Sequence, residues 1–291
     1  MASPISVFRK GANALITGGA SGVGLAVAKL CATHAMNIIL VDNNTSKLDE
    51  AKSMLSSTKA GNVDTHSMDV ASLSDWSKLK SHVESGGTKL DFLHLNAGIG
   101  LKSDWTDSAY FHKIMDVNLF GVINGINTFF PHFEGNTSGE QKAIVVTGSK
   151  QGITNPPGNP AYNASKSAVK TITEHLSFDL AKSSPNTSVH LLVPGWTFTG
   201  LTGGGNAKEK PAGAWAPEQV ADHLYQKMGE GKFYVICPDN DVGFEEDRRR
   251  MMWTMGDVVF ERLPQSRWRE EYKEEAGRTM EGMKLGAKQA D

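Results

Sequence analysis

Short apolar runs alternate with amphipathic stretches along most of the chain. Within each run the apolar residues are consecutive rather than alternating, which is typical of strands buried on both faces of a parallel sheet. The pattern predicts seven strands, at residues 12–17, 37–42, 63–70, 90–95, 142–147, 188–193 and 233–237.

The stretches between these runs have the spacing of amphipathic helices. Helices are predicted at residues 22–35, 46–58, 107–130 and 217–228, with two more after Ser72 and around Tyr162, the latter reaching about residue 182. Strand–helix alternation with right-handed crossovers builds a sheet covered by helices on both faces. We therefore expect residues 1–240 to form one α/β domain, a doubly wound Rossmann-type fold with a seven-stranded parallel sheet.

Two segments depart from this alternation. Residues 197–216 are rich in glycine and poor in apolar residues, which predicts a mobile loop. Residues 241–291 are strongly charged but also carry Met251, Met252 and Trp253. We expect one or two amphipathic helices here, a helical extension of the same domain. An oligomer contact is the favoured role, and a partial cover for the active site is the alternative.

Composition and charge narrow the function classes. The 291 residues are 39% hydrophobic and 21% charged, as in an ordinary globular protein. A formal net charge of −2 provides no electrostatic attraction to nucleic acid or to an anionic membrane surface. No run approaches the roughly 18 apolar residues of a membrane span, and the N-terminus leads directly into a strand, so we expect neither a span nor a secretory signal.

The cysteines and histidines suggest no metal site. Cys31 and Cys237 lie in apolar segments without metal-type spacing, and we expect reduced thiols in a cytoplasmic protein. The nine histidines show no His-x-x-x-His pattern and no pairing with cysteine. No metal is therefore predicted.

A glycine-rich turn, Thr17–Gly24, falls between the first predicted strand and the first helix. Glycines at this place let the backbone approach a pyrophosphate, and the helix N-terminus supplies free N–H groups and a partial positive charge. A tight turn without a ligand is the alternative. The strand–turn–helix context favours dinucleotide binding; the candidate contacts are Gly18, Ser21, Gly22, Val23 and Gly24.

Asp42 ends the second predicted strand, where the ribose of a bound adenosine would lie. A carboxylate there accepts hydrogen bonds from ribose hydroxyls and repels a 2′-phosphate. No Lys or Arg occurs in the glycine turn or directly after Asp42 to neutralise such a phosphate. NAD is therefore predicted in preference to NADP, unless Asp42 only caps the following turn.

Tyr162 and Lys166 lie four residues apart on one predicted helix, so their side chains share a face. A phenol titrates near about 10 in water, which is too high for a base at neutral pH. A fixed ammonium nearby lowers that pKa and would let Tyr162 exchange a proton with an alcohol or carbonyl oxygen. Such pairs also arise by chance on surface helices, so the pair depends on its context.

Together, the Thr17–Gly24 turn, Asn96-Ala97-Gly98 after the fourth strand and the Tyr162-x-x-x-Lys166 pair resemble the short-chain dehydrogenase/reductase family. The spacing of the turn is similar to the family's shorter, single-domain branch, and the resemblance covers about residues 10–240.

The resemblance implies roles for further cofactor-binding residues. Asp69 and Val70 match the pair that contacts adenine. Asn96 matches the residue that stabilises the sheet beside the cofactor ribose, in a segment with Ala97 and Gly98. A last group matches the stretch that holds the nicotinamide carboxamide: Pro194, Gly195, Thr197 and Thr199.

The resemblance also implies the catalytic residues. Tyr162 would be the general acid/base, and Lys166 would lower its pKa and bind the cofactor ribose. Ser149 would bind the substrate oxygen; its separation from Tyr162, 162 − 149 = 13, is the one expected in the family. The backbone carbonyl of Asn118 would hold a water in the proton relay.

The expected substrate site borders two loops. Lys150 and Gln151 replace the usual residues after Ser149 and would lie at the pocket rim. The other candidate substrate contacts are apolar or aromatic: Pro156, Trp196, Phe198 and Trp215. Such a wall suits an apolar or ring-bearing alcohol or ketone.

We therefore expect an NAD-dependent oxidoreductase that interconverts a secondary alcohol and a ketone. One alternative is a catalytically idle NAD-binding module, and a second is an epimerase or dehydratase without net cofactor turnover. The resemblance further implies a homodimer or homotetramer, with contacts through the last strand and the helix before it.

Overall fold

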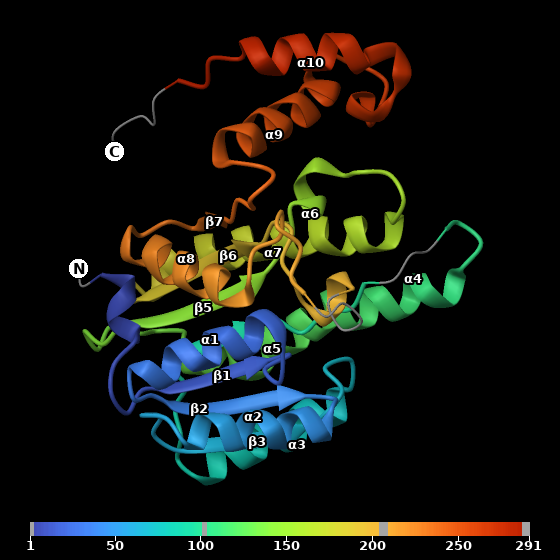
Figure 1. Cartoon of the computed structure of the whole chain (residues 1–291). Coiled ribbons are helices and arrows are strands. Elements are labelled where there is room, and N and C mark those ends of the chain that lie inside the picture. The colour runs from blue at the N-terminus through green and yellow to red at the C-terminus, as the bar shows by residue number, and fades with distance from the viewer. Residues whose placement is uncertain (1–2, 101–103, 204–208, 287–291) are drawn as a thin grey trace.

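The fold was analysed in a computed structural model that describes residues 3–100, 104–203 and 209–286. In these residues the chain forms one sheet of seven parallel strands in the order β3-β2-β1-β4-β5-β6-β7, which confirms the predicted Rossmann-type fold (Figure 1). The strands are β1 (Asn13–Thr17), β2 (Asn37–Asp42), β3 (Val63–Ser67), β4 (Phe92–Leu95), β5 (Lys142–Thr147), β6 (Thr187–Val193) and β7 (Tyr234–Ile236).

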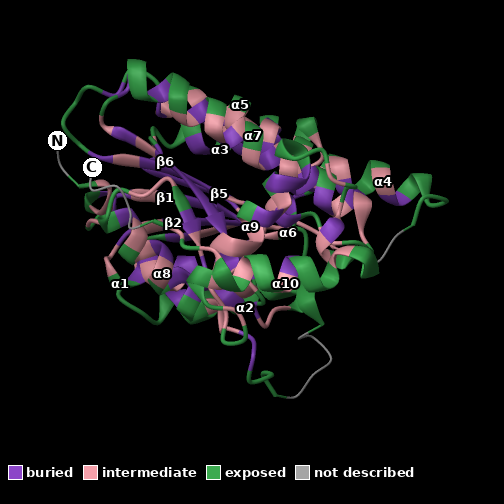
Figure 2. Cartoon of the chain, turned by 90° about the horizontal axis from the view of Figure 1, so that it is seen from above, coloured by how far each residue is buried: buried purple, intermediate pink, exposed green. Residues whose placement is uncertain are grey.

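Each face of the sheet is covered by its own set of helices (Figure 2). α1 (Gly22–Thr33), α2 (Thr45–Ser56) and α8 (Pro217–Gly229) share one apolar cluster with residues such as Ala14 and Ile16 of β1. Residues of α3 (Leu73–Ser85), α5 (Gly121–Phe129) and α7 (Pro160–Ser183) form the cluster on the other face, which includes Leu15. Because adjacent residues of β1 enter different clusters, its three central positions, Ala14, Leu15 and Ile16, are all apolar.

The predicted helix over residues 107–130 is interrupted. It divides into α4 (Ser108–Met115), a π-helical turn at Asp116–Phe120, and α5. In the π-helical turn the N–H of Gly121 donates to the carbonyl of Asp116, one residue farther back than in an α-helix. This turn carries Asn118. The third strand also ends earlier than predicted, at Ser67 rather than residue 70.

The predicted loop at 197–216 is partly ordered. Thr197 pairs with Trp215 in an isolated bridge, and Gly200–Thr202 forms a short 3-10 helix. Residues 204–208 of this predicted mobile loop lie outside the described residues.

After β7 the described chain forms α9 (Phe244–Val259) and α10 (Lys273–Gly282), where one or two amphipathic helices were predicted. They lie next to each other beyond the β7 edge of the sheet, and α9 contacts α6 (Gln151–Thr154) (Figure 1). A small buried centre holds this extension together: the indole of Trp253 donates to Ser266 at 2.8 Å, and Ser266 donates to Asp257 at 2.5 Å. Arg262 pairs with Asp257 and stacks 3.8 Å over the Trp253 ring. Among the described residues no helix is long and apolar enough to cross a membrane.

Candidate active site

The start of α7 places the Tyr162–Lys166 pair. Pro160 fits the first turn of the helix, and the side chain of Asn159 caps it by accepting the N–H of Tyr162 at 3.2 Å. Lys166 lies one turn further on, with its Nζ 5.9 Å from the centre of the Tyr162 ring. The two side chains therefore share one face of the helix, as the spacing predicts.

Lys166 is buried, with 4% of its surface exposed. Its Nζ donates to the carbonyl of Thr147, the last residue of β5, at 2.8 Å. Burial lowers the pKa of this amine to about 8. The ammonium of Lys166 has lost most of its solvent on burial, and further hydrogen-bond acceptors next to it would stabilise its charge.

Tyr162 differs from the expectation of a lowered pKa. Burial raises the pKa of the phenol, a hydrogen bond with Ser149 lowers it less, and Tyr110 adds a further increase. Loss of solvent on burial is the largest of these effects, and it favours the neutral phenol. The phenol is protonated at neutral pH and is in hydrogen-bond contact with Ser149.

Asn118 ties the π-helical turn to the rest of the site. Its side chain is fully buried and bonds both backbone groups of Ile99, accepting the N–H at 2.8 Å and donating to the carbonyl at 3.0 Å. It also donates to the hydroxyl of Ser165 at 3.2 Å. A Cβ placed on Gly98 would lie 3.3 Å from Oδ1 of Asn118 and 3.7 Å from Nζ of Lys166. The four predicted catalytic residues thus lie in one neighbourhood.

The glycines of the turn have little room for a Cβ. A Cβ on Gly24 would lie 2.1 Å from the carbonyl oxygen of Gly18, and Gly18 and Gly22 have φ values of +62° and +53°. A Cβ on Gly22 would lie 3.2 Å from Thr199, so the turn faces the predicted carboxamide segment. The backbone cradle expected for a pyrophosphate is present at the start of α1, where Ser21 is the N-cap residue and Val23 follows in the first turn.

Asp42 lies at the end of β2 beside this turn. One carboxylate oxygen accepts the N–H of Ala20 at 3.2 Å and the other accepts the N–H of Asn44 at 3.1 Å. The charge is therefore fixed next to the glycine turn, where the prediction requires it.

Asn96 joins the carboxyl ends of three strands. Its amide donates to the carbonyls of Thr17 and Gly18 at 3.2 and 3.3 Å, and its oxygen accepts from Thr147 at 3.1 Å. The hydroxyl of Thr17 accepts the backbone N–H groups of Asn96 and Ala97. This network orders the floor of the cofactor crevice.

The remaining cofactor candidates follow the strand ends. Asp69 accepts the N–H of Ala71 at 2.9 Å, and Val70 is buried. Pro194 and Gly195 follow β6, and the buried Thr197 donates to the carbonyl of Gly195 at 3.2 Å.

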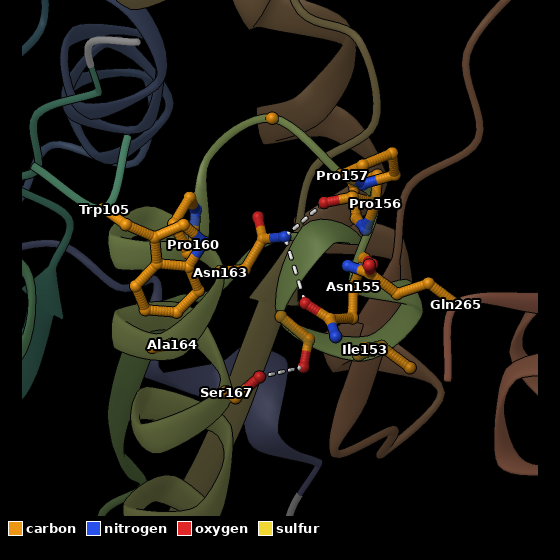
Figure 3. Close-up of a pocket in the computed structure, with 12 residues that line it drawn as sticks. Trp105, Ile153, Asn155, Pro156, Pro157, Pro160, Asn163, Ala164, Ser167 and Gln265 are labelled. Carbon is orange, nitrogen blue, oxygen red and sulfur yellow. Dashed lines mark hydrogen bonds between the residues drawn. The ribbon is translucent and has the colours of Figure 1, made fainter. Parts of the chain in front are cut away.

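The structure redirects two of the predicted substrate contacts. The ammonium of Lys150 is held by Asp239 and Asp247 rather than by the pocket rim. Pro156 lines a separate cavity of about 540 Å³ on the face of α7 that carries Asn163 and Ser167 (Figure 3). In this cavity the amide of Asn163 donates to the carbonyl of Pro156 at 2.6 Å.

The other predicted substrate contacts stay near the loops. Gln151 is exposed at the start of α6, and Trp196 is 42% exposed. The backbones of Phe198 and Trp196 bond to that of Trp215 at 2.8 and 2.9 Å. Gln151, Trp196, Phe198 and Trp215 stay predicted substrate contacts.

Two residues beside Tyr162 were missed. Tyr110 of α4 accepts a hydrogen bond from Asn159 at 3.3 Å, and Leu201 flanks Gly100 together with the Tyr162 ring, each about 3.5 Å or less from a Cβ placed there. Tyr110 lies 52 positions before Tyr162, counted as 162 − 110, so nothing in the local pattern signals the contact.

Several histidines have polar partners that their local sequence pattern does not indicate. His94 bonds Thr147 at 2.9 Å through one ring nitrogen, while the other is buried without a partner among the described residues. Burial lowers its pKa to about 3. Asp64, His66 and His82 converge so that their ligand atoms lie within 4.8 Å, although no metal-type spacing connects them in the sequence.

Comparisons with known proteins agree with this geometry. Residues 12–210 match the short chain dehydrogenase family model. An uncharacterized oxidoreductase of Listeria innocua is 30% identical over 223 residues, which cover 74% of this chain and 83% of the relative. The NADP-dependent (R)-specific alcohol dehydrogenase of Lentilactobacillus kefiri is 26% identical over 194 residues, covering 66% and 75%.

Solved structures show the same similarity. A short chain dehydrogenase/reductase from Burkholderia phymatum in complex with NAD superposes with a TM-score of 0.77 at 25% identity, covering 88% of this chain and 96% of the other. A short-chain dehydrogenase from Novosphingobium aromaticivorans superposes with a TM-score of 0.70 at 26% identity, covering 93% and 99%. The chain therefore belongs to the short chain dehydrogenase family of oxidoreductases.

Proposed function

We propose that the protein is an NAD-dependent oxidoreductase that interconverts a secondary alcohol and a ketone. The observation that carries the proposal is the convergence of Tyr162 and Ser149, in hydrogen-bond contact, with the buried Lys166. Hydroxyl, phenol and ammonium in one neighbourhood can bind a reacting oxygen and exchange its proton.

The residues present fit a dinucleotide. The glycine-rich Gly18–Gly24 turn leads into the N-terminus of α1, and one oxygen of the Asp42 carboxylate accepts the N–H of Ala20 in this turn. When bound, a nicotinamide coenzyme supplies the hydride donor or acceptor. Lys166 would then exchange part of its contact with Thr147 for the ribose hydroxyls.

The chain's own residues account for the movement of the proton. Ser149 donates a hydrogen bond to the substrate oxygen and stabilises the charge that develops there. Tyr162, which is protonated in the free protein, gives its proton to the oxygen of a ketone as the C–H bond forms. In the opposite direction the phenolate takes the alcohol proton, and Lys166 stabilises that phenolate. Asn118 fixes the helix turn whose backbone would hold a relay water.

NAD is proposed as the preferred coenzyme because the fixed charge of Asp42 opposes a 2′-phosphate. The similar proteins include both an NAD complex and an NADP-dependent enzyme, and they therefore do not favour either coenzyme. The proposal of NAD rests on Asp42 of this chain. In Asp42→Asn, which keeps the shape but removes the charge, we expect the NADP-to-NAD ratio of kcat/KM to rise about tenfold or more. An unchanged ratio would contradict the role of the carboxylate.

An apolar or ring-bearing substrate is proposed from the wall around the site. Leu201 lies beside Tyr162, and Trp196 and Phe198 border the same segment. Two further proposals rest on other surfaces. Buried, unpaired Cys31 and Cys237 support a reducing compartment such as the cytoplasm, and exposed apolar residues of α9 support a homodimer or homotetramer.

The test is turnover of a panel of secondary alcohols and ketones with both coenzymes, followed by nicotinamide absorbance. Tyr162→Phe should abolish turnover while tryptophan fluorescence still reports NAD binding close to that of the wild type. Undiminished turnover in this variant would reject the assignment. Binding of NAD without turnover of any panel member would favour the idle module, and product without net absorbance change would favour an epimerase or dehydratase.

A further inference from the structure

A buried ion cluster joins the C-terminal extension to the segment that carries Ser149. Lys150 follows Ser149 directly, and its Nζ lies 2.6 Å from Oδ2 of Asp247 in α9. The same Nζ lies 3.3 Å from Oδ2 of Asp239, which follows β7. The side chains of Lys150, Asp239 and Asp247 are 15%, 7% and 3% exposed. The ammonium is therefore enclosed by carboxylates from two other parts of the chain.

Asp239 extends the cluster to the predicted carboxamide segment. The oxygen that faces Lys150 also accepts the backbone N–H of Trp196 at 3.0 Å. Its other oxygen accepts the N–H of Val242 at 2.8 Å, which fixes the turn into α9. A Cβ on Gly195 would lie 2.7 Å from Asp239 and 2.8 Å from Lys150. The cluster thus packs directly against the backbone that follows β6.

The charges in the cluster do not balance. One ammonium serves two carboxylates, and burial raises the pKa of Asp247 while Lys150, and more weakly Arg250, lower it. The desolvation penalty of buried charged groups offsets much of the free energy gained from their ion pairing, so the cluster is weak evidence for added stability. It fixes one arrangement of three segments, because each charge has a partner only when all three are in place.

A second contact supports the same arrangement. Gln265, beyond α9, donates to the carbonyl of Asn155 at 3.1 Å. Asn155 follows α6 and lies between Ser149 and Tyr162 in the chain. The extension therefore holds the Ser149–Tyr162 segment at two points, Lys150 and Asn155.

We infer that the C-terminal extension positions Ser149 for catalysis and that Lys150 and Asp247 are the positioning residues. This inference rests on the proposed role of Ser149 and Tyr162. Neither positioning residue touches the reacting atoms: Asp247 holds Lys150, and Lys150 sets the backbone of its neighbour Ser149. The C-terminal extension thereby fixes the position of the Ser149 hydroxyl.

The experiment compares Asp247→Asn with Glu245→Gln, a carboxylate-to-amide change on the same turn of α9. Glu245 is 58% exposed and pairs with Arg248, so its change should be silent. Two quantities are measured in the full chain: steady-state kinetics, and hydrogen–deuterium exchange of backbone amides in residues 148–156. Melting temperature checks that each variant folds.

We expect Asp247→Asn to lower kcat by about tenfold or more while the Kd of NAD changes less than about threefold, because the glycine turn and Asp42 are untouched. Amide exchange in residues 148–156 should rise. The double variant Lys150→Gln/Asp247→Asn should lose about as much kcat as the more severe single variant, since both changes act through one pair.

Two outcomes would overturn the inference: unchanged exchange in residues 148–156, or a loss of kcat equal to that of Glu245→Gln. These outcomes differ from failure of the proposed function. That failure appears as a wild-type chain without turnover, and amide exchange would still report whether the extension orders the segment.

Discussion

Replacing Lys166 with methionine should stabilise the free protein while abolishing turnover. Burial lowers the pKa of this amine from 10.5 to about 8. This difference corresponds to about 3 kcal/mol by which the buried charge of Lys166 destabilises the folded state. The variant also loses the hydrogen bond to Thr147, which costs about 1 kcal/mol. We therefore expect the free energy of unfolding to rise by about 2 kcal/mol.

The pH dependence identifies the cause. The folded amine loses its proton at about pH 8 and the unfolded amine at 10.5, so between these values the unfolded chain binds more protons. The penalty is complete below about pH 8 and disappears as the pH rises toward 10.5. The advantage of Lys166→Met over the wild type should shrink across this window.

Urea unfolding in the absence of coenzyme measures the effect. Lys52→Met on the exposed face of α2 is the matched control, expected to change stability by less than about 0.5 kcal/mol. A Lys166→Met chain that is less stable than the wild type at neutral pH would refute the reasoning, and so would a stability difference that does not depend on pH.

Two further predictions concern acid stability and the glycine turn. His94 and His190 have pKa values lowered by burial to about 3 and about 4, against 6.5 in the unfolded chain, so the unfolding free energy should fall by about 2 kcal/mol per histidine from about pH 7 to about pH 5. In denaturant titrations, His190→Asn should show about half of the wild-type loss of unfolding free energy over this pH range. A loss equal to that of the wild type would show that the imidazole of His190 does not cause it. Gly24→Ala places a Cβ 2.1 Å from the Gly18 carbonyl oxygen. The change should lower the free energy of unfolding by about 2 kcal/mol or more and should also weaken NAD binding. Gly277→Ala in α10, where a Cβ meets nothing within 4 Å, is the control; equal melting temperatures of the two variants would count against the close contact.

The strands and the glycine turn were predictable because local physics determines them. Strands buried on both faces are apolar at most positions, and a turn with as close a backbone approach as that at Gly24 must contain glycine. The place of Tyr162 was predictable for a similar reason, because a spacing of four residues on one helix fixes the relative position of two side chains.

Features that depend on distant segments were not predictable. The partners of Lys150 come from beyond β7. Burial raises the pKa of the Tyr162 phenol, while Ser149 lowers it and Tyr110 raises it further. Asp64 and His82 meet only because β3 and α3 pack together. In each case the residues can be identified from the sequence, but tertiary packing determines which charged groups and rings they contact.

The ion cluster also has a consequence for biosynthesis. The two carboxylates that hold Lys150 lie 89 and 247 − 150 = 97 positions later in the chain. While the ribosome is still adding those residues, the ammonium has been made but its counter-charges have not. A polypeptide interrupted before α9 would carry Tyr162, Lys166 and Ser149 and would keep Asp239, yet it would lack Asp247. Premature termination would therefore yield a product that contains the glycine turn but holds Ser149 less firmly.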